Sequence, residues 1–370
     1  MSMTRLPVDR PPLDTMAQML ASAVVEPDVN PFIAWKVGRH LRDEVLGNLS
    51  GIEMWADACD LTDALRRVIG DDAQRSLRVH HHDAPEADAT KVAQWFRARM
   101  ALAPNEVMRV DAAVVGEELV LGCRVNHLVA DAVDACDVFG SVGDVLMARP
   151  PRLTMYAPMV PVCDTGHYND PAAEDDVRAA LPDSGALEGV RGAGRLGSVS
   201  TVEVVVQRGD VRFDEVLHAC SAAFADVCGD VQVWRYPFVH PEHRGLRGYH
   251  SQLKMIGVQA HEPIEDIRAR RAALENAGWF TEQPAETCAQ EVAAAGYLRL
   301  VLTETRFYEY LCPEFDDLRT TSPRSIDDVR VQMQRDGSSC RLRLQHKNRL
   351  MDTAKAEAVA QRVSAALHDA

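Results

Sequence analysis

The sequence predicts an α/β protein of two similar halves, each built around a mixed sheet. The chain has 370 residues, 46% of them hydrophobic, which is enough to form one large core or two of ordinary size. Strand and helix patterns follow one another in a loosely repeated order before and after residues 151–195. That segment is rich in Pro, Gly and Asp and has no periodicity. We therefore interpret 1–150 as an N-terminal half, 151–195 as a linker and 196–370 as a C-terminal half.

The N-terminal half alternates short apolar runs with helical spacings. Its first fifty residues predict helix, because Leu13, Met16 and Leu20 keep helical spacing and Phe32 to Leu46 roughly resume it. Apolar runs, an N-cap at Asp60 and turn residues set the elements that follow. In order, we expect a strand at 52–58, a helix after Asp60, a strand at 76–81, a helix at 91–100, a hairpin of 107–114 with 119–125, and a helix after Asp131.

The C-terminal half repeats this order. β-branched runs predict strands, and apolar residues at helical spacing predict helices, the last of which is capped by Asp352. The expected elements are a strand at 198–207, a helix at 213–227, a strand at 231–239, a helix at 264–277, strands at 297–303, 329–334 and 340–345, and a closing helix with an apolar face of Ala356, Val359, Val363 and Leu367.

Charge and composition exclude several classes of function. Forty Lys and Arg against 55 Asp and Glu give a net charge of −15, and no basic block occurs, so we expect no nucleic-acid or membrane partner. The nine cysteines form neither a C-x-x-C pair nor a short disulfide framework. No secretory signal and no run of eighteen apolar residues is present. These features favour a cytoplasmic protein that acts on a small molecule or another protein.

One loop carries residues suited to catalysis. His127 lies at the exit of the predicted hairpin, one residue after Asn126, and Asp131 lies four residues further on, before the next helix. An imidazole on such a turn can take a proton from an attacking hydroxyl or amine, a role worth roughly 10²- to 10⁴-fold in rate. Asp131 is expected to hold the turn through an arginine and not to touch substrate. A turn histidine with purely structural bonds is the alternative, because thirteen histidines give chance matches to His-x-x-x-Asp.

The residues around this loop resemble a known family. Residues 105–132 are similar to the central block of nonribosomal peptide synthetase condensation domains, in which a hairpin leads into a His-His-x-x-x-Asp-Gly motif. The same turn recurs as His-x-x-x-Asp across the chloramphenicol acetyltransferase-like superfamily. Pro241 to Tyr249 resembles the family's Pro-Glu-x-x-Gly-Leu-Ile-Gly-Phe segment. Residues 60–79 and 340–367 resemble its early and closing elements, so the likeness spans nearly the whole chain.

The resemblance implies a fold and an activity. The fold is two chloramphenicol acetyltransferase-like halves in a V-shaped pseudo-dimer with a central tunnel. The activity is condensation-type acyl transfer in nonribosomal peptide-like, antibiotic-type biosynthesis. The donor is a phosphopantetheine thioester on an acyl or peptidyl carrier protein or coenzyme A, and the acceptor is a small amine or alcohol. His127 is then the general base and Asp131 a structural residue. The candidate substrate-binding residues are Asn126, Ala132, Arg235, Tyr249, His250 and Ser251, with Arg235 also a candidate partner of Asp131.

The chain also departs from the family pattern. Asn126 stands in place of the motif's first His, Ala132 in place of its Gly, and His250-Ser251-Gln252 is more polar than the family's Val-Asn-Thr. The chain is shorter than a typical condensation domain, mostly between 150 and 230. We therefore expect a divergent, freestanding member. Two alternatives stay open: a noncatalytic protein that docks a carrier or partner enzyme, and an enzyme that cyclises or eliminates on a tethered intermediate.

Two further motifs have ordinary explanations. His80-His81-His82 suggests a metal, but consecutive strand residues point to opposite faces and no further ligand is suitably spaced, so no metal is predicted. Gly192 to Gly197 has the spacing of a dinucleotide-binding loop, but no strand precedes it. We therefore expect no bound cofactor.

Overall fold

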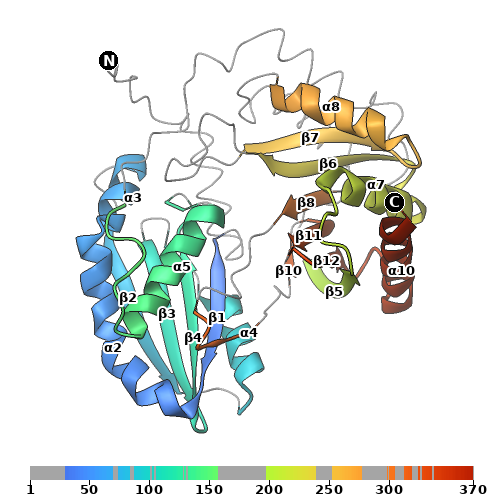
Figure 1. Ribbon diagram of the computed structural model, residues 1–370. Coiled ribbons are helices and arrows are strands. Elements are labelled where there is room, and N and C mark those ends of the chain that lie inside the picture. Colours follow the sequence, from blue (N-terminus) through green and yellow to red (C-terminus); the bar gives the residue numbers. More distant parts are fainter. Residues whose placement is uncertain are drawn as a thin grey trace, which may run out of the picture. The chain divides into compact units, whose positions relative to one another are not determined.

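The chain folds into two compact units (Figure 1). The structure is a computed structural model, and it describes residues 30–69, 74–83, 87–100, 102–103, 106–127, 129–130, 132–156, 197–238, 252–276, 298, 300–304, 312–318, 324–325, 327–335 and 337–369. Within these, the first unit holds residues 30–156 and 312–318, and the second holds 197–304 and 324–369. In the part of the chain that is described, no helix is long and apolar enough to span a membrane.

The first unit is built on a five-stranded mixed sheet with the order β2-β3-β4-β1-β9. β2 and β3 are parallel, whereas the other neighbours are antiparallel. The strands are β1 (Phe32–Val37), β2 (Gln74–Asp83), β3 (Glu106–Val115), β4 (Glu118–Val125) and β9 (Asp316–Asp317). The hairpin predicted from the sequence is confirmed as β3 and β4. Its turn uses Gly116 at φ +61°, a left-handed conformation that glycine adopts without strain.

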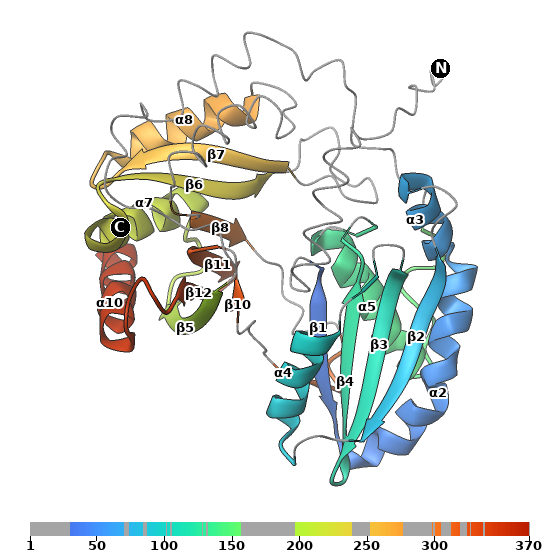
Figure 2. The ribbon, with the colours of Figure 1, turned by 180° about the vertical axis from the view of Figure 1, so that it is seen from behind.

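Helices cover both faces of this sheet, as Figures 1 and 2 show from opposite sides. They are α2 (Arg39–Ala58), α3 (Leu61–Ile69), α4 (Ala89–Arg99) and α5 (Ala132–Leu146). Trp35 of β1 packs in one core with α2, α3 and α5, whereas its neighbour Ala34 packs in a second core with Phe96 of α4. Successive residues of β1 therefore face opposite helical layers, as a central strand requires.

Two predicted elements of this unit are wrong. Residues 32–37 form a strand and not a helix, because alternate side chains are buried on both faces of the sheet. Residues 52–58 are the end of α2 and not a strand, because Ile52, Trp55 and Ala56 are buried at helical spacing. In both places a short apolar run fits either period, and the packing partners decide between them. The helix expected near Leu13 lies outside the described residues.

The second unit has a seven-stranded mixed sheet with the order β10-β5-β12-β11-β8-β6-β7. Its strands are β5 (Gly197–Val206), β6 (Val231–Phe238), β7 (Gln252–Gln259), β8 (Leu300–Glu304), β10 (Arg324–Ser325), β11 (Val329–Arg335) and β12 (Cys340–Lys347). Only β8 pairs in parallel, with β6 and β11, among the described strands of this sheet. Strand β7 was not predicted. The predictions for β5, β6, β8, β11 and β12 are confirmed, apart from their exact ends.

Three helices pack with this sheet in one core that includes Trp234, Val331 and Val363. They are α7 (Phe213–Cys228), α8 (Ile264–Asn276) and α10 (Thr353–Asp369), all of which were predicted. The Asp352 side chain accepts the Lys355 backbone N–H at 2.8 Å, which confirms the predicted N-cap. Both units are therefore α/β structures with mixed sheets, as the sequence predicts.

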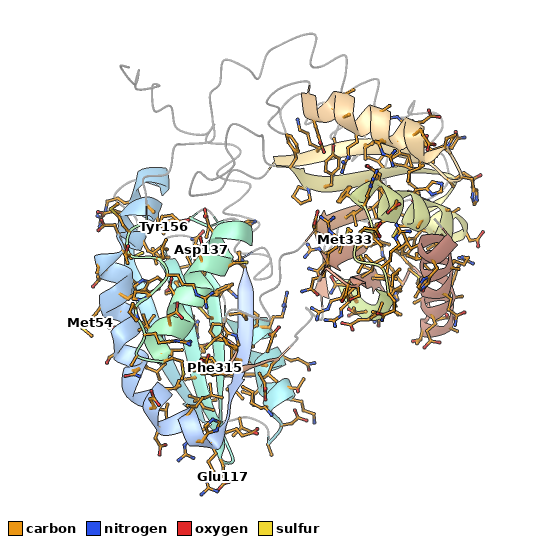
Figure 3. The ribbon with its side chains drawn as sticks, in the orientation of Figure 1. Met54, Glu117, Asp137, Tyr156, Phe315 and Met333 are labelled. Carbon is orange, nitrogen blue, oxygen red and sulfur yellow. The ribbon has the colours of Figure 1, made fainter. Side chains whose placement is uncertain are left out.

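A segment from late in the sequence completes the first unit. Residues 316 and 317 form β9 at the free edge of β1, pairing with Lys36 and Trp35. Phe315, labelled in Figure 3, lies beside this sheet. Its ring meets Trp35 edge-on, with ring centroids 5.8 Å apart. Two acidic residues carry no strand signal, so this edge strand was not predicted. The contact ties residues 312–318 to the sheet that supports the candidate site.

Candidate functional site

The candidate site lies on the loop between β4 and α5. The loop leaves the sheet between β1 and β3. On one side, Val125 N–H donates to Pro31 O, just before β1, at 3.2 Å. On the other side, Asn126 N–H donates to Val107 O of β3 at 2.7 Å. These bonds continue the sheet one residue past the end of β4. His127 is therefore the first residue of the loop that the sheet no longer pairs. The strand ends fix its starting position.

The His127 ring is oriented by its own loop. Its Nδ1 atom lies 2.9 Å from Ala130 O, and the residue is half-buried. A carbonyl oxygen only accepts hydrogen bonds, so Nδ1 carries the hydrogen. In the neutral imidazole the lone pair is then on Nε2, which is the form a general base needs. The loop geometry thus selects one tautomer.

Backbone bonds inside the loop hold this arrangement. Asn126 O accepts the N–H groups of Val129, at 3.0 Å, and Ala130, at 3.2 Å. The Asn126 side chain is buried, and its amide donates to Glu106 O, at the start of β3, at 2.9 Å. Asn126 therefore fastens the loop to the hairpin with both its backbone and its side chain.

A second anchor reaches the loop from the start of β1. Asn30 Oδ1 accepts the His127 backbone N–H at 2.9 Å. Beside it, the fully buried Arg124 guanidinium donates to Asn30 O at 3.4 Å and to Arg97 O at 2.8 Å, and it lies over the Phe32 ring. Backbone carbonyls and an aromatic face suit a buried guanidinium because all offer negative partial charge. Sequence reasoning identified neither Asn30 nor Arg124.

A third anchor of the loop is Tyr156, which follows α5 in the sequence. The buried Tyr156 hydroxyl donates to Val129 O at 2.6 Å and lies 3.2 Å from Asp134 Oδ2 on α5. Figure 3 places Tyr156 and Asp137 of α5 at the same end of the unit, and Glu117 of the hairpin turn at the opposite end. Tyr156 falls in the segment interpreted as linker, where nothing in the sequence marked it.

The structure brings together only some of the predicted site residues. Asn126 and His127 are adjacent and fully described, and Ala132 opens α5. Arg235 is half-buried on β6 of the second unit. Asp131, Tyr249, His250 and Ser251 lie outside the described residues. The roles assigned to these residues stay predictions, as does the pairing of Asp131 with Arg235.

Neither metal nor thiol chemistry is indicated where side chains are described. No group of three or more His, Cys, Asp or Glu in that part of the chain is placed to hold a metal. Burial raises the pKa of the Cys123 and Cys220 thiols, so both behave as small apolar side chains. Residues 80–82 lie within β2, where their backbone pairs with β3. The His127 loop is therefore the best candidate site.

Comparison with known proteins supports the fold directly. No family model and no curated protein matches the sequence. Among solved structures, the first condensation domain of the calcium-dependent antibiotic synthetase matches with a TM-score of 0.64 and 14% identity, over 96% of this chain and 95% of that one. The chain has the condensation-domain fold.

Two further structures share this fold. The rhizomide synthetase starter condensation domain, a mutant in complex with C8-CoA and Leu-SNAC, matches with a TM-score of 0.61 and 13% identity, over 96% of this chain and 92% of that one. The epimerization domain from the third module of tyrocidine synthetase B matches with a TM-score of 0.57 and 11% identity, over 92% and 90%. Identities this low fit a divergent condensation-domain fold and leave its chemistry to be argued from the site.

The departure at Asn126 has a structural explanation within the condensation-domain fold. Asn126 stands where the family motif has its first His, and its buried amide reaches the backbone of β3. The bond from His127 Nδ1 to Ala130 does not involve the Asn126 side chain. The bond that orients the His127 ring is therefore made to a backbone carbonyl, Ala130 O.

Proposed function

We propose that this chain is a condensation-type acyltransferase in which His127 is the general base. The observation that carries the proposal is the bond from His127 Nδ1 to Ala130 O, because it puts the imidazole lone pair on Nε2. Three separate anchors, Asn30, Asn126 and Tyr156, restrain the few residues of this loop.

The proposed reaction balances with this single base. The acceptor nitrogen or oxygen attacks the carbonyl carbon of a thioester while His127 Nε2 takes its proton. The C–S bond then breaks, and the departing thiolate receives the proton from the imidazolium. The products are an amide or ester and a free thiol, and the neutral imidazole is restored. Such a positioned base contributes roughly 10²- to 10⁴-fold to the rate.

The proposed donor is a phosphopantetheine thioester on a carrier protein or coenzyme A. Its support is the rhizomide synthetase domain of the same fold, which was solved with C8-CoA and Leu-SNAC. The proposed acceptor is a small amine or alcohol. Asp131 is proposed to shape the loop and to leave the chemistry to His127. Asp131→Asn should then lower the melting temperature at least as clearly as it lowers turnover.

A second candidate function is a different reaction on a tethered intermediate, or docking without catalysis. The likeness to an epimerization domain favours the first of these, because that domain has the same fold and is named for a different reaction, epimerization. Asn126 and Ala132, which depart from the family motif, favour docking. Both candidates predict that no acyl-transfer product forms.

The experiment is a product screen with the purified full-length chain. Acyl-SNAC thioesters and acyl-coenzyme A are each offered with a panel of amines and alcohols, and mass spectrometry detects the amide or ester. His127→Ala is compared with His40→Ala, which removes an exposed histidine of α2 in the same unit. We expect a product that depends on His127 and not on His40. If product forms equally with His127→Ala, the base is elsewhere.

A further inference from the structure

We propose that Tyr156 is a positioning residue that sets the tautomer of His127. Its hydroxyl fixes the peptide between Val129 and Ala130, and the next carbonyl, Ala130 O, receives the hydrogen of His127 Nδ1. The effect of Tyr156 on the His127 tautomer does not depend on what the chain catalyses. Its effect on turnover rests on the proposed function.

The contact is short and buried. Tyr156 is only 2% exposed, and its oxygen lies 2.6 Å from Val129 O and 3.2 Å from Asp134 Oδ2. A phenol has a single hydrogen, so the two oxygens compete for it and the nearer one, Val129 O, is favoured. Val129 is fully buried, so its carbonyl depends on protein donors.

Tyr156 is itself held by two helices. Its backbone N–H donates to Cys59 O, at the end of α2, at 2.8 Å. Its hydroxyl also lies 3.2 Å from Asp134 Oδ2, near the start of α5. The tyrosine therefore links the end of α2 and the start of α5 to the loop.

The peptide joining Val129 and Ala130 depends on this bond. Its oxygen is held by Tyr156 at 2.6 Å, whereas its N–H donates to Asn126 O over a longer distance of 3.2 Å. Without the hydroxyl, a buried carbonyl loses its donor, and rotation of the peptide is the way to regain one. Rotation of this peptide changes φ of Ala130, the residue whose own carbonyl accepts from Nδ1, and we propose that it displaces Ala130 O from Nδ1. The hydrogen then has no reason to stay on Nδ1, and the Nε2–H tautomer, which cannot accept a proton at Nε2, becomes populated.

The test compares Tyr156→Phe with a matched control, Trp55→Phe. Tyr156→Phe keeps the buried ring and removes only the hydroxyl. Trp55→Phe removes another buried bond from the same segment, to Leu153 O, without touching the loop. Two readouts are taken on the full-length chain: ¹⁵N NMR of the imidazole, which distinguishes the tautomers, and kcat and KM separately. The His127 signal is assigned by its absence in His127→Ala.

We expect Tyr156→Phe to shift the ¹⁵N signals of His127 towards the Nε2–H tautomer and to lower kcat by about tenfold, with KM within about twofold of wild type. Trp55→Phe should lower the melting temperature and change neither readout. Para-aminophenylalanine at position 156 keeps an N–H donor there and should restore both.

Two outcomes separate this inference from the proposed function. Unchanged ¹⁵N signals in Tyr156→Phe would overturn the positioning role, whatever the chain catalyses. Shifted ¹⁵N signals support it, even if His127→Ala turns out to keep full activity and the proposed function fails. A change of the same size in Trp55→Phe would also overturn it, because the effect would then belong to the segment and not to the hydroxyl.

Discussion

The side-chain oxygen of Asn30 accepts the backbone N–H of His127 at 2.9 Å, across 97 residues of sequence. Asn30 is buried and stands immediately before Pro31 and β1. The start of the first described strand therefore holds the residue proposed as the base. Any change at Asn30 should act on the loop and on the fold together.

Asn30→Ala should lower both stability and turnover. The His127 N–H loses its acceptor in a part-buried position, which costs about 1 kcal/mol in the free energy of unfolding. Asn48→Ala is the matched control. It removes the hydrogen bond from the Asn48 side-chain amide to Leu146 O, in the same unit but outside the loop. Urea unfolding and turnover are measured for both variants. If Asn30→Ala affects turnover no more than Asn48→Ala does, Asn30 has no special connection to the site.

Phe315→Ala should destabilise the first unit strongly. The ring is 4% exposed and packs edge-on against Trp35, so its removal leaves a cavity worth about 3–5 kcal/mol. Glu314→Ala provides the comparison in the same segment, because it breaks a partly exposed ion pair with Arg149, which is worth under about 1 kcal/mol. Urea unfolding measures the loss in unfolding free energy for both variants. Equal losses would show that residues 312–318 do not contribute a packed edge to this sheet.

In the second unit, replacing the two partners of a buried ion pair should cost different amounts of stability. Lys347 Nζ lies 3.0 Å from Asp328 Oδ1, and the side chains are 1% and 0% exposed, while Arg349 also donates to Asp328. Asp328→Ala leaves the buried ammonium without this carboxylate, at a cost of about 3–5 kcal/mol. Lys347→Met leaves Asp328 paired with Arg349 and should cost less. Thermal unfolding that ranked them in the opposite order would contradict this assignment.

Lys254 should make the stability of the second unit depend on pH. Burial lowers its pKa from 10.5 to about 8, and Glu275 offsets this only in part. Between these two pH values the unfolded chain binds more protons than the folded one, so this contribution to stability rises with pH and its penalty is largest below pH 8. Lys254→Met should therefore stabilise the protein at pH 7, by up to about 3 kcal/mol, and by much less near pH 10.

The measurement for Lys254 is the difference in unfolding free energy between variant and wild type at several pH values from 7 to 10, a range that brackets the lowered pKa of about 8. Taking the difference removes the titration of other groups. Lys355→Met, which removes an exposed lysine of α10, is the comparison for the loss of one positive charge. A Lys254→Met difference that does not shrink as pH rises would mean that the amine is not buried in its charged form at pH 7.

Elements with a clear period were predictable, and those defined by their partners were not. The β3–β4 hairpin has two apolar runs around a glycine turn, and α10 has a cap and one apolar stripe, so local sequence determines both. The run at 52–58 fits two periods, and only its burial against α5 and the sheet makes it helix. The two residues of β9 become a strand through pairing with β1 alone.

The same distinction applies to the site. His127 was predictable because the base and its expected turn lie within a few residues of one another. Asn30 and Tyr156 reach the loop across 97 and 27 residues, and both bond to backbone groups, which every residue type has. No side-chain pattern in the sequence marks such contacts. The supporting residues therefore became visible only with the fold.

The rate of acyl transfer by His127→Ala, measured against wild type with the chain's own acceptor, tests the central claim most directly. We predict a loss of about 10²- to 10⁴-fold, with an unchanged melting temperature and unchanged affinity for a loaded carrier protein. A loss of less than about tenfold would mean that His127 only positions the acceptor and that proximity supplies most of the rate. Turnover equal to that of wild type would contradict the assignment of His127 as the base.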